Sequence, residues 1–263
     1  MNVKPIILKL GGSVITHKEK PLTPNREAIN RLAHEVSRAN TLRLVIVHGG
    51  GSFGHPIAKR YRINEGLKKS SQIMGFSKTH QAMTKLNKIV IDALITNNIP
   101  AVEVQPSSFV ITKSERIETI DNKVVEKLLE TGFVPVLYGD VVLDYDKGFA
   151  VLSGDQLVSS LATQLAAERI IIGVDVDGLY TSDPKKDKTA KLVRHINLQE
   201  LGKMQLGVRE ATVTDVTGGM LGKISELTPP VEAGISVLIV NALKPDNVYK
   251  ALKGQRIVGT LIE

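Results

Sequence analysis

Residues 42–56 read LRLVIVHGGGSFGHP, in which an apolar run typical of a strand leads straight into three consecutive glycines. Adjacent glycines cost conformational entropy, and that cost makes sense mainly where a ligand must come very near the backbone. The stretch lacks the closing Gly-Lys-Ser/Thr of a P-loop and the spacing of a dinucleotide-binding fingerprint. It therefore predicts a ligand-binding turn at the end of a strand, in neither a P-loop nor a Rossmann protein.

Similar apolar runs, rich in β-branched residues, alternate with segments of helical period along the whole chain. Most of the runs are uninterrupted, as in a parallel sheet that is buried on both faces. The predicted strands are residues 6–10, 42–47, 101–104, 133–137, 169–174 and 236–240. The fold class is therefore expected to be α/β, with an open and mainly parallel sheet sandwiched by helices.

The segments between these runs carry apolar stripes that predict helices packed on the sheet. The first stripe comprises Ile29, Leu32, Ala33 and Val36. A helix predicted over residues 155–168 carries Leu157, Val158, Leu161 and Leu165. A longer helix is predicted over residues 71–97, where Ile73, Phe76 and Met83 are candidates for lining an apolar ligand pocket.

Two further patterns concern the second half of the chain. Residues 141–144 and 149–152 flank Tyr145-Asp146-Lys147-Gly148, which predicts an added β-hairpin that stands off the parallel sheet. Proline inside a helix removes a hydrogen bond and clashes with the preceding turn, so Pro229 and Pro230 are expected to break the helix that begins near Met220. Because no linker or repeat is visible, residues 1–263 are expected to form one domain with two lobes.

Composition narrows the class of protein. The 263 residues include no cysteine, which excludes disulfides and thiolate metal sites and fits a reducing, cytoplasmic location. No signal-type segment and no apolar run of about 20 residues is present, so no membrane partner is expected. The net charge of +7 is spread along the chain, with five Phe, five Tyr and no Trp, which argues against nucleic acid and suits a small acidic ligand.

Three more turns carry residues suited to ligand binding or catalysis. Each of them follows another predicted strand or begins a helix. They are Lys9-Leu10-Gly11-Gly12-Ser13, Val174-Asp175-Val176-Asp177-Gly178 and Asp215-Val216-Thr217-Gly218-Gly219-Met220-Leu221-Gly222-Lys223. Glycines at a strand end or helix start point N–H groups at an anion, and a nearby lysine adds charge. Taken singly, each turn is also compatible with a tight structural turn or, for the aspartates, with self-capping carboxylates. Because open α/β sheets bind ligands at strand carboxyl ends, the turns together predict a phosphate site.

These turns and Ser153-Gly154-Asp155 resemble, in order and over almost the whole length, the amino acid kinase family. Within it the chain is most similar to the isopentenyl phosphate kinase branch, because Lys18 follows the first turn and the triple glycine continues into Gly54-His55-Pro56. The segment Gln105-Pro106-Ser107-Ser108-Phe109 also resembles that branch. The resemblance implies a cytoplasmic enzyme of isoprenoid biosynthesis by the mevalonate pathway, with ATP as co-substrate, Mg²⁺ as cofactor and a homodimeric assembly.

The resemblance also implies roles for individual residues. Lys9 and Lys223 would hold the β- and γ-phosphates of ATP, Lys18 would reach the transferred group, and Asp155 would orient Lys9, so these four residues and His55 form the expected catalytic set. The expected ATP site comprises Lys9, Gly11, Gly12, Ser13, Gly51, Asp175, Asp177, Gly219 and Lys223. Residues before about 150 would form the phosphate-acceptor lobe, and residues 151–263 the ATP lobe.

Isopentenyl phosphate is the expected acceptor, and the residues implied for it are Gly50, Gly51, His55 and Gly154. His55 would donate to the acceptor phosphate, where nearby anions favour its charged form. A phosphate monoester has a second pKa of about 6 and can attack directly, so no general base is expected. No protein residue is assigned to metal binding. Two alternatives are a kinase of another small phosphate or phosphonate, such as fosfomycin, and a non-catalytic nucleotide-binding or storage protein.

Overall fold

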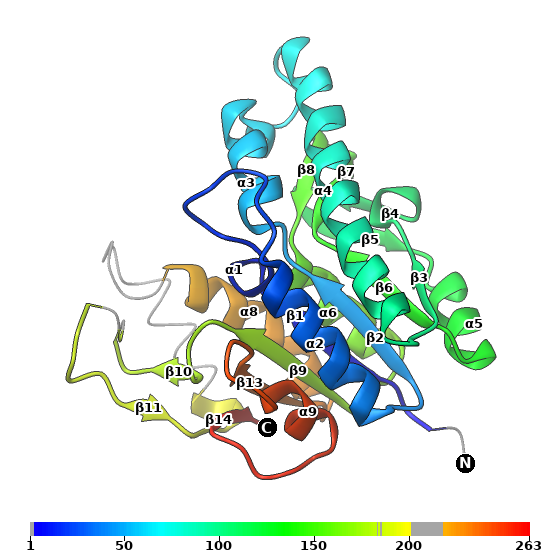
Figure 1. The fold of residues 1–263 in the computed structure, drawn as a ribbon. Helices are drawn as coiled ribbons and strands as arrows, with labels where there is room; N and C mark the ends of the chain where they lie inside the picture. The colour runs from blue at the N-terminus through cyan, green and yellow to red at the C-terminus, as the bar shows by residue number, and fades with distance from the viewer. Residues whose placement is uncertain (1–2, 183, 185, 201–217) are drawn as a thin grey trace.

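A computed structural model describes residues 3–182, 184, 186–200 and 218–263, with side chains of the helix that opens at Gly218 described from Ser225 onward. The chain folds around an eight-stranded sheet with the order β12-β14-β13-β9-β1-β2-β6-β3 (Figure 1). The six strands from β13 to β3 are all parallel, and β14 runs antiparallel to β13. The strands are β1 (Ile6–Leu10), β2 (Leu44–His48), β3 (Ala101–Glu103), β6 (Val134–Tyr138), β9 (Arg169–Val174), β12 (His195–Ile196), β13 (Ser236–Asn241) and β14 (Gly259–Ile262). All six predicted strands are thus confirmed, with ends shifted by at most two residues.

Helices cover both faces of this sheet, as Figure 1 shows. On one face lie α2 (Arg26–Ala39), the carboxyl-terminal half of α4 (Ser71–Thr96) and α9 (Asn247–Leu252). On the other lie α5 (Lys123–Thr131), α6 (Gly154–Gln164) and α8 (Gly218–Glu232). The shorter elements near the site are α1 (Gly12–Ile15), α3 (Gly51–Arg60), η1 (Ile63–Glu65) and η2 (Pro106–Ser108). The expected α/β sandwich is confirmed.

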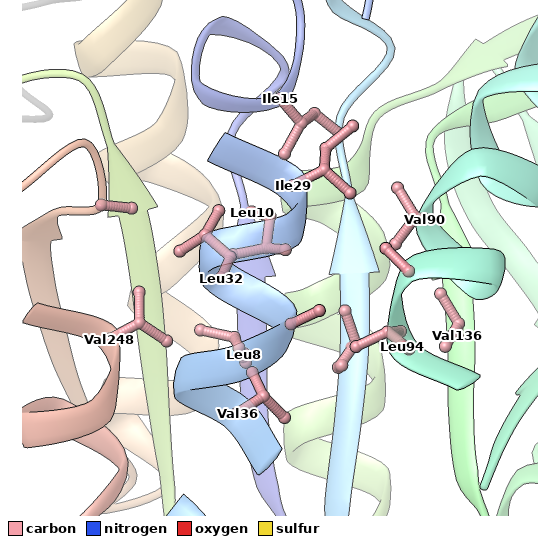
Figure 2. Packing of buried hydrophobic residues seen from close by; sticks show 14 of the residues in the cluster. Leu8, Leu10, Ile15, Ile29, Leu32, Val36, Val90, Leu94, Val136 and Val248 are labelled. Carbon is pink, nitrogen blue, oxygen red and sulfur yellow. The ribbon is translucent and has the colours of Figure 1, made fainter. Parts of the chain in front are cut away.

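The apolar core is split by the sheet into two layers. Along β1, Ile6, Leu8 and Leu10 face α2 and α4, whereas Ile7 faces α6 and α8. Figure 2 shows the first layer, where Leu32 and Val36 of α2 pack over β1. The predicted stripe of α2 is buried throughout. The predicted stripe of α6 is buried at Leu157, Val158 and Leu161 but only half-buried at Leu165. The helix ends at Gln164, before Leu165, because Ala166 takes a left-handed conformation, with φ of 47°.

A second, four-stranded sheet has the order β5-β4-β7-β8. Its strands are β4 (Val110–Lys113), β5 (Arg116–Ile120), β7 (Asp140–Asp144) and β8 (Gly148–Leu152). The predicted hairpin is confirmed as β7 and β8, and it belongs to a larger sheet that was not predicted, because β4 pairs with β7 in parallel and β5 pairs with β4. β5 is mostly exposed, so it lacks the buried apolar alternation by which a strand is found in a sequence.

The predicted break of α8 at Pro229 and Pro230 is wrong. α8 continues to Glu232 with both prolines inside it. The prolines lie in its last turns, where Ala233 and Ile235 still donate to the carbonyls of Pro229 and Pro230. Buried Leu227 and Val231 hold this end of the helix in the core. Apolar packing therefore offsets the two missing donors. No helix in the described part of the chain is long and apolar enough to span a membrane.

Candidate active site

The predicted turns meet at one edge of the main sheet. β1 lies between β2 and β9 and runs parallel to both, so the segments that follow the three strands are neighbours. The N–H of Gly11 donates to the carbonyl of Gly173 at 2.8 Å, and the N–H of Gly49 donates to the carbonyl of Leu10 at 3.0 Å. Sequence and topology therefore bring together three segments of the chain, the last of which lies more than 100 residues after the other two.

The turns after β1 and β2 are in backbone contact with each other. A methyl group on Gly12 would lie 2.4 Å from the nitrogen of Gly51, a distance that no real Cβ adopts. Gly51 itself has a φ of +46°, which favours glycine. Thr16 stabilises the contact between the two turns, since its hydroxyl donates to the carbonyl of Gly12 at 2.7 Å and accepts from the N–H of Ser52 at 3.0 Å. The two turns thus form one rigid junction.

Lys9, at the end of β1, lies beneath this junction. Only 3% of its side chain is exposed, and its ammonium group forms an ion pair with Asp155. Asp155 lies in the first turn of α6, whose amino terminus is capped by Ser153, with Oγ accepting from the N–H of Gln156 at 3.1 Å. A buried charge of this kind requires a partner, and Asp155 supplies one to Lys9. Gly154 packs beside them, since a Cβ there would lie 3.6 Å from Cε of Lys9.

Asp175, in the turn after β9, links two of the other predicted residues. Its Oδ1 accepts from Oγ of Ser13 at 3.0 Å, and its Oδ2 lies 3.4 Å from Nζ of Lys18. Lys18 is 56% exposed and reaches this carboxylate from the loop after α1. The arrangement brings Ser13, Lys18 and Asp175 to one side of the glycine junction.

Asp177 makes contacts that the sequence did not predict. Its carboxylate accepts from Nδ2 of Asn241 at 3.0 Å and lies 2.7 Å from Nζ of Lys244. The hydrogen bond from Lys244, helped by that from Asn241, lowers the pKa of Asp177 against the opposing effect of burial. Asn241 ends β13, the neighbour of β9 in the sheet, and Lys244 follows it, so the only signal in the sequence was their position after the predicted strand 236–240.

His55 lies exposed on the second turn of α3, which begins in the triple-glycine turn. The candidates for an apolar pocket differ in their placement. The sulfur of Met83 packs against Gly50 and Gly54, where an added Cβ would lie 3.0 and 2.9 Å from it. Phe76 packs against Phe149 of β8, with ring centroids 5.6 Å apart. Ile73 is 56% exposed, so α4 offers Met83 and Phe76 rather than Ile73 as a wall.

The fourth predicted turn can be followed only in part. Gly219 belongs to the first turn of α8, whereas residues 215–217 and the side chain of Lys223 lie outside the described part of the structure. Within the described ranges, no group of three or more His, Asp or Glu side chains is placed to hold a metal ion. Asp155, Asp175 and Asp177 are each engaged with a lysine instead.

A junction of glycine turns over a buried lysine, at the edge of a parallel sheet, is an arrangement suited to phosphate groups, as expected for a phosphotransferase. The sequence profile of the Amino acid kinase family matches residues 4–241, and the chain belongs to that family. Isopentenyl phosphate kinase of Methanothermobacter thermautotrophicus is 45% identical, over 98% of both chains, and that of Methanocaldococcus jannaschii is 36% identical over the same share. The resemblance to this branch is thereby confirmed.

Solved structures agree with the sequence relatives. An X-ray structure of isopentenyl phosphate kinase superimposes with a TM-score of 0.87 and 42% identity, over 98% of this chain and all of that one. An isopentenyl phosphate kinase in a substrate complex superimposes with a TM-score of 0.82 and 28% identity, over 99% of this chain.

Proposed function

We propose that the protein transfers the γ-phosphoryl group of ATP to isopentenyl phosphate and forms isopentenyl diphosphate and ADP. The observation that carries this proposal is the contact between Gly12 and Gly51 above the buried Lys9. In this proposal the turn after β1 binds ATP, the turn after β2 binds the acceptor, and Lys9 supplies a buried positive charge at the end of β1. The relatives with 45% and 36% identity support the choice of acceptor.

In this mechanism an oxygen of the acceptor phosphate attacks the γ-phosphorus in line, and the bond to the oxygen bridging the β- and γ-phosphates breaks as ADP leaves. Such a transfer depends on positioning and charge neutralisation. N–H groups of the turn after β1 bind ATP, those of Gly50 and Gly51 bind the acceptor, and Lys9 neutralises charge between them. Because the acceptor phosphate is ionised near neutral pH, no side chain has to remove a proton.

The remaining assignments complete the proposal. Lys18 and Lys223 contact the phosphates, Gly219 approaches ATP, Asp175 and Asp177 orient the nucleotide, and His55 and Gly154 contact the acceptor. Mg²⁺ would supply further charge neutralisation at the phosphates of ATP, and no protein residue is assigned to hold it. The acceptor lobe comprises approximately residues 1–150 and the ATP lobe residues 151–263. A homodimer and a cytoplasmic location are part of the same proposal.

An apolar cluster suits the hydrocarbon part of the acceptor. Ile63, Val141 and Phe149 are buried together, with Phe76 and Tyr61 packed against them. The cluster joins η1, α4 and the second sheet, close to the face of α4 from which Met83 reaches the triple-glycine turn. We therefore assign α4, β7 and β8 as the walls around the acceptor tail.

The test is an ADP-release assay with ATP, Mg²⁺ and a panel of isopentenyl phosphate, dimethylallyl phosphate, fosfomycin, UMP and N-acetylglutamate. Turnover of isopentenyl phosphate, alone or with its isomer, is expected. Turnover confined to fosfomycin or UMP would support kinase activity but overturn isopentenyl phosphate as the acceptor. Measurable ATP binding with no turnover of any acceptor would favour a nucleotide-binding protein without catalysis.

His55 offers a sharper test of the acceptor site. His55→Ala is expected to lower kcat/KM for isopentenyl phosphate by about tenfold or more, because a charge-assisted hydrogen bond to phosphate is lost. ATP affinity, measured by calorimetry without acceptor, should stay within about twofold because His55 is assigned no contact with ATP. The exposed His34→Ala on α2 is the matched control. Normal turnover by His55→Ala would remove this histidine from the mechanism.

A further inference from the structure

His48, the last residue of β2, is fully buried directly before the triple glycine. Its ring stacks on Tyr138 of β6, with centroids 5.5 Å apart and an interplanar angle of 24°. Nδ1 lies 3.2 Å from the carbonyl oxygen of Gly49, and Nε2 lies 3.1 Å from Oδ1 of Asn87 on α4. Tyr138 in turn donates to Oε1 of Glu103 at 2.8 Å. No local pattern in the sequence assigned His48 or Asn87 a role in the site.

Burial fixes the charge state of His48. Desolvation lowers the pKa of the imidazole, and hydrogen bonds to Gly49 and Asn87 and the charge of Glu103 oppose this without reversing it. A neutral imidazole has one N–H. The carbonyl of Gly49 can only accept, so the proton belongs on Nδ1, and Nε2 then needs a donor.

Asn87 can supply that donor. With Oδ1 toward His48, the amide leaves its buried Nδ2 with no hydrogen-bond partner in the described structure. Exchanging the two ends of the amide turns the NH₂ group toward Nε2 and gives both groups a partner. An unpaired buried donor is costlier than an unpaired carbonyl oxygen.

The hydrogen bond at Nδ1 has a consequence for the glycine turn. The carbonyl of Gly49 and the N–H of Gly50 belong to one planar peptide group, in which they point in opposite directions. Holding the carbonyl inward on His48 therefore directs the N–H of Gly50 outward, toward the side where the acceptor phosphate is proposed to bind. Glycines have no side chain with which to fix this plane themselves.

We infer that His48 and Asn87 are positioning residues: neutral His48 donates from Nδ1 to Gly49, accepts at Nε2 from the amide of Asn87, and so orients the N–H of Gly50 toward the acceptor phosphate. The inference rests on the proposed acceptor site. It also links that site to α4, because Asn87 lies one turn beyond Met83, which packs against Gly50 and Gly54.

The first test is spectroscopic and needs no turnover. In long-range ¹H–¹⁵N spectra, His48 is expected to show the neutral form with the proton on Nδ1, unchanged between about pH 7.5 and 9 because its pKa lies below the ordinary value of about 6.5. A proton on Nε2, or titration within that range, would overturn the inference whether or not the enzyme accepts isopentenyl phosphate.

The second test uses Asn87→Asp, which has nearly the same shape but can only accept. It should move the proton to Nε2, shift the amide resonance of Gly50, and raise KM for isopentenyl phosphate about tenfold, with KM for ATP within about twofold. The exposed Asn30→Asp on α2 is the matched control. If Asn87→Asp does not fold, Asn87→Leu is used, which removes the donor without adding charge and should produce the same shift of Gly50. An unchanged Gly50 resonance, or an unchanged KM in a folded variant, would contradict the positioning role.

Discussion

Lys9 has two roles that can be separated by mutation. Its charge is buried to 3% exposure against Asp155, so its removal both alters the reaction centre and leaves a carboxylate without its partner. Lys9→Met is expected to lower kcat by at least about a hundredfold through lost charge stabilisation. It should also destabilise the fold by about 3 kcal/mol, as expected when one member of a buried pair is removed.

The double variant Lys9→Met/Asp155→Asn separates these effects. It should recover most of the lost unfolding free energy, because no unpaired charge remains, while turnover stays low. Denaturant unfolding and the ADP-release assay measure the two properties on the same samples. Recovery of turnover together with stability would mean that Lys9 matters for folding alone.

At the scale of elements, the turn between β7 and β8 depends on one carboxylate. Asp144 accepts from the backbone N–H groups of Glu115, Asp146 and Lys147 and from the hydroxyl of Thr112, at 2.8 to 2.9 Å. Burial raises the pKa of Asp144, but these hydrogen bonds outweigh it and lower the pKa to about 2. The carboxylate therefore joins the β4–β5 connection to the β7–β8 turn.

The sign of the pH dependence follows from the lowered pKa. The stabilisation by Asp144 is present above its ordinary pKa of 3.8 and is lost as the pH falls through about 2. Asp144→Asn should therefore cost about 2 kcal/mol of unfolding free energy at pH 7 and much less at about pH 2. Exposed Asp92→Asn, which breaks only a surface pair with Lys88, should cost little at either pH. An equal cost of Asp144→Asn at both values would exclude the charged form as the stabilising one.

At the scale of the whole molecule, His80 and Asp140 connect α4 to the second sheet. Nδ1 of His80 lies 2.8 Å from a carboxylate oxygen of Asp140, whose side chain is fully buried. The hydrogen bond to Asp140 raises the pKa of His80 against the effect of burial, and burial raises the pKa of Asp140. The charged pair therefore exists between the raised pKa of Asp140 and the raised pKa of His80.

A histidine whose pKa is raised by folding contributes its full stabilisation at pH values below its unfolded pKa of 6.5. That stabilisation is lost as the pH rises through its folded pKa. The difference in unfolding free energy between the wild type and His80→Gln should therefore be larger at about pH 6 than at about pH 8.5. Urea unfolding at both values measures it. The exposed His34→Gln should show no such change with pH, and a pH-independent difference for His80→Gln would contradict the charged pair.

The parts of this molecule that the sequence predicts are those with a local signal. Six of the eight strands of the main sheet are apolar runs and were predicted, as were the glycine turns that follow them, whereas β12 and β14 were missed. The β5 strand, the pair of His48 with Asn87, and the contacts of Asp177 with Lys244 depend on partners distant in the chain. Pro229 and Pro230 were also mispredicted, because tertiary packing keeps α8 helical where the local preference of proline predicts a break.

The backbone contact between Gly12 and Gly51 bears on how such enzymes change during evolution. In the proposed mechanism the donor and acceptor phosphates meet where two neighbouring strands end, so their separation would not depend on a hinge or on the side chains around the rest of the acceptor. Lineages can then exchange residues of α4, β7 and β8 to admit a new molecule while inheriting an intact reaction geometry. Diversification of acceptors would in this way leave the meeting point of the two phosphates unaltered.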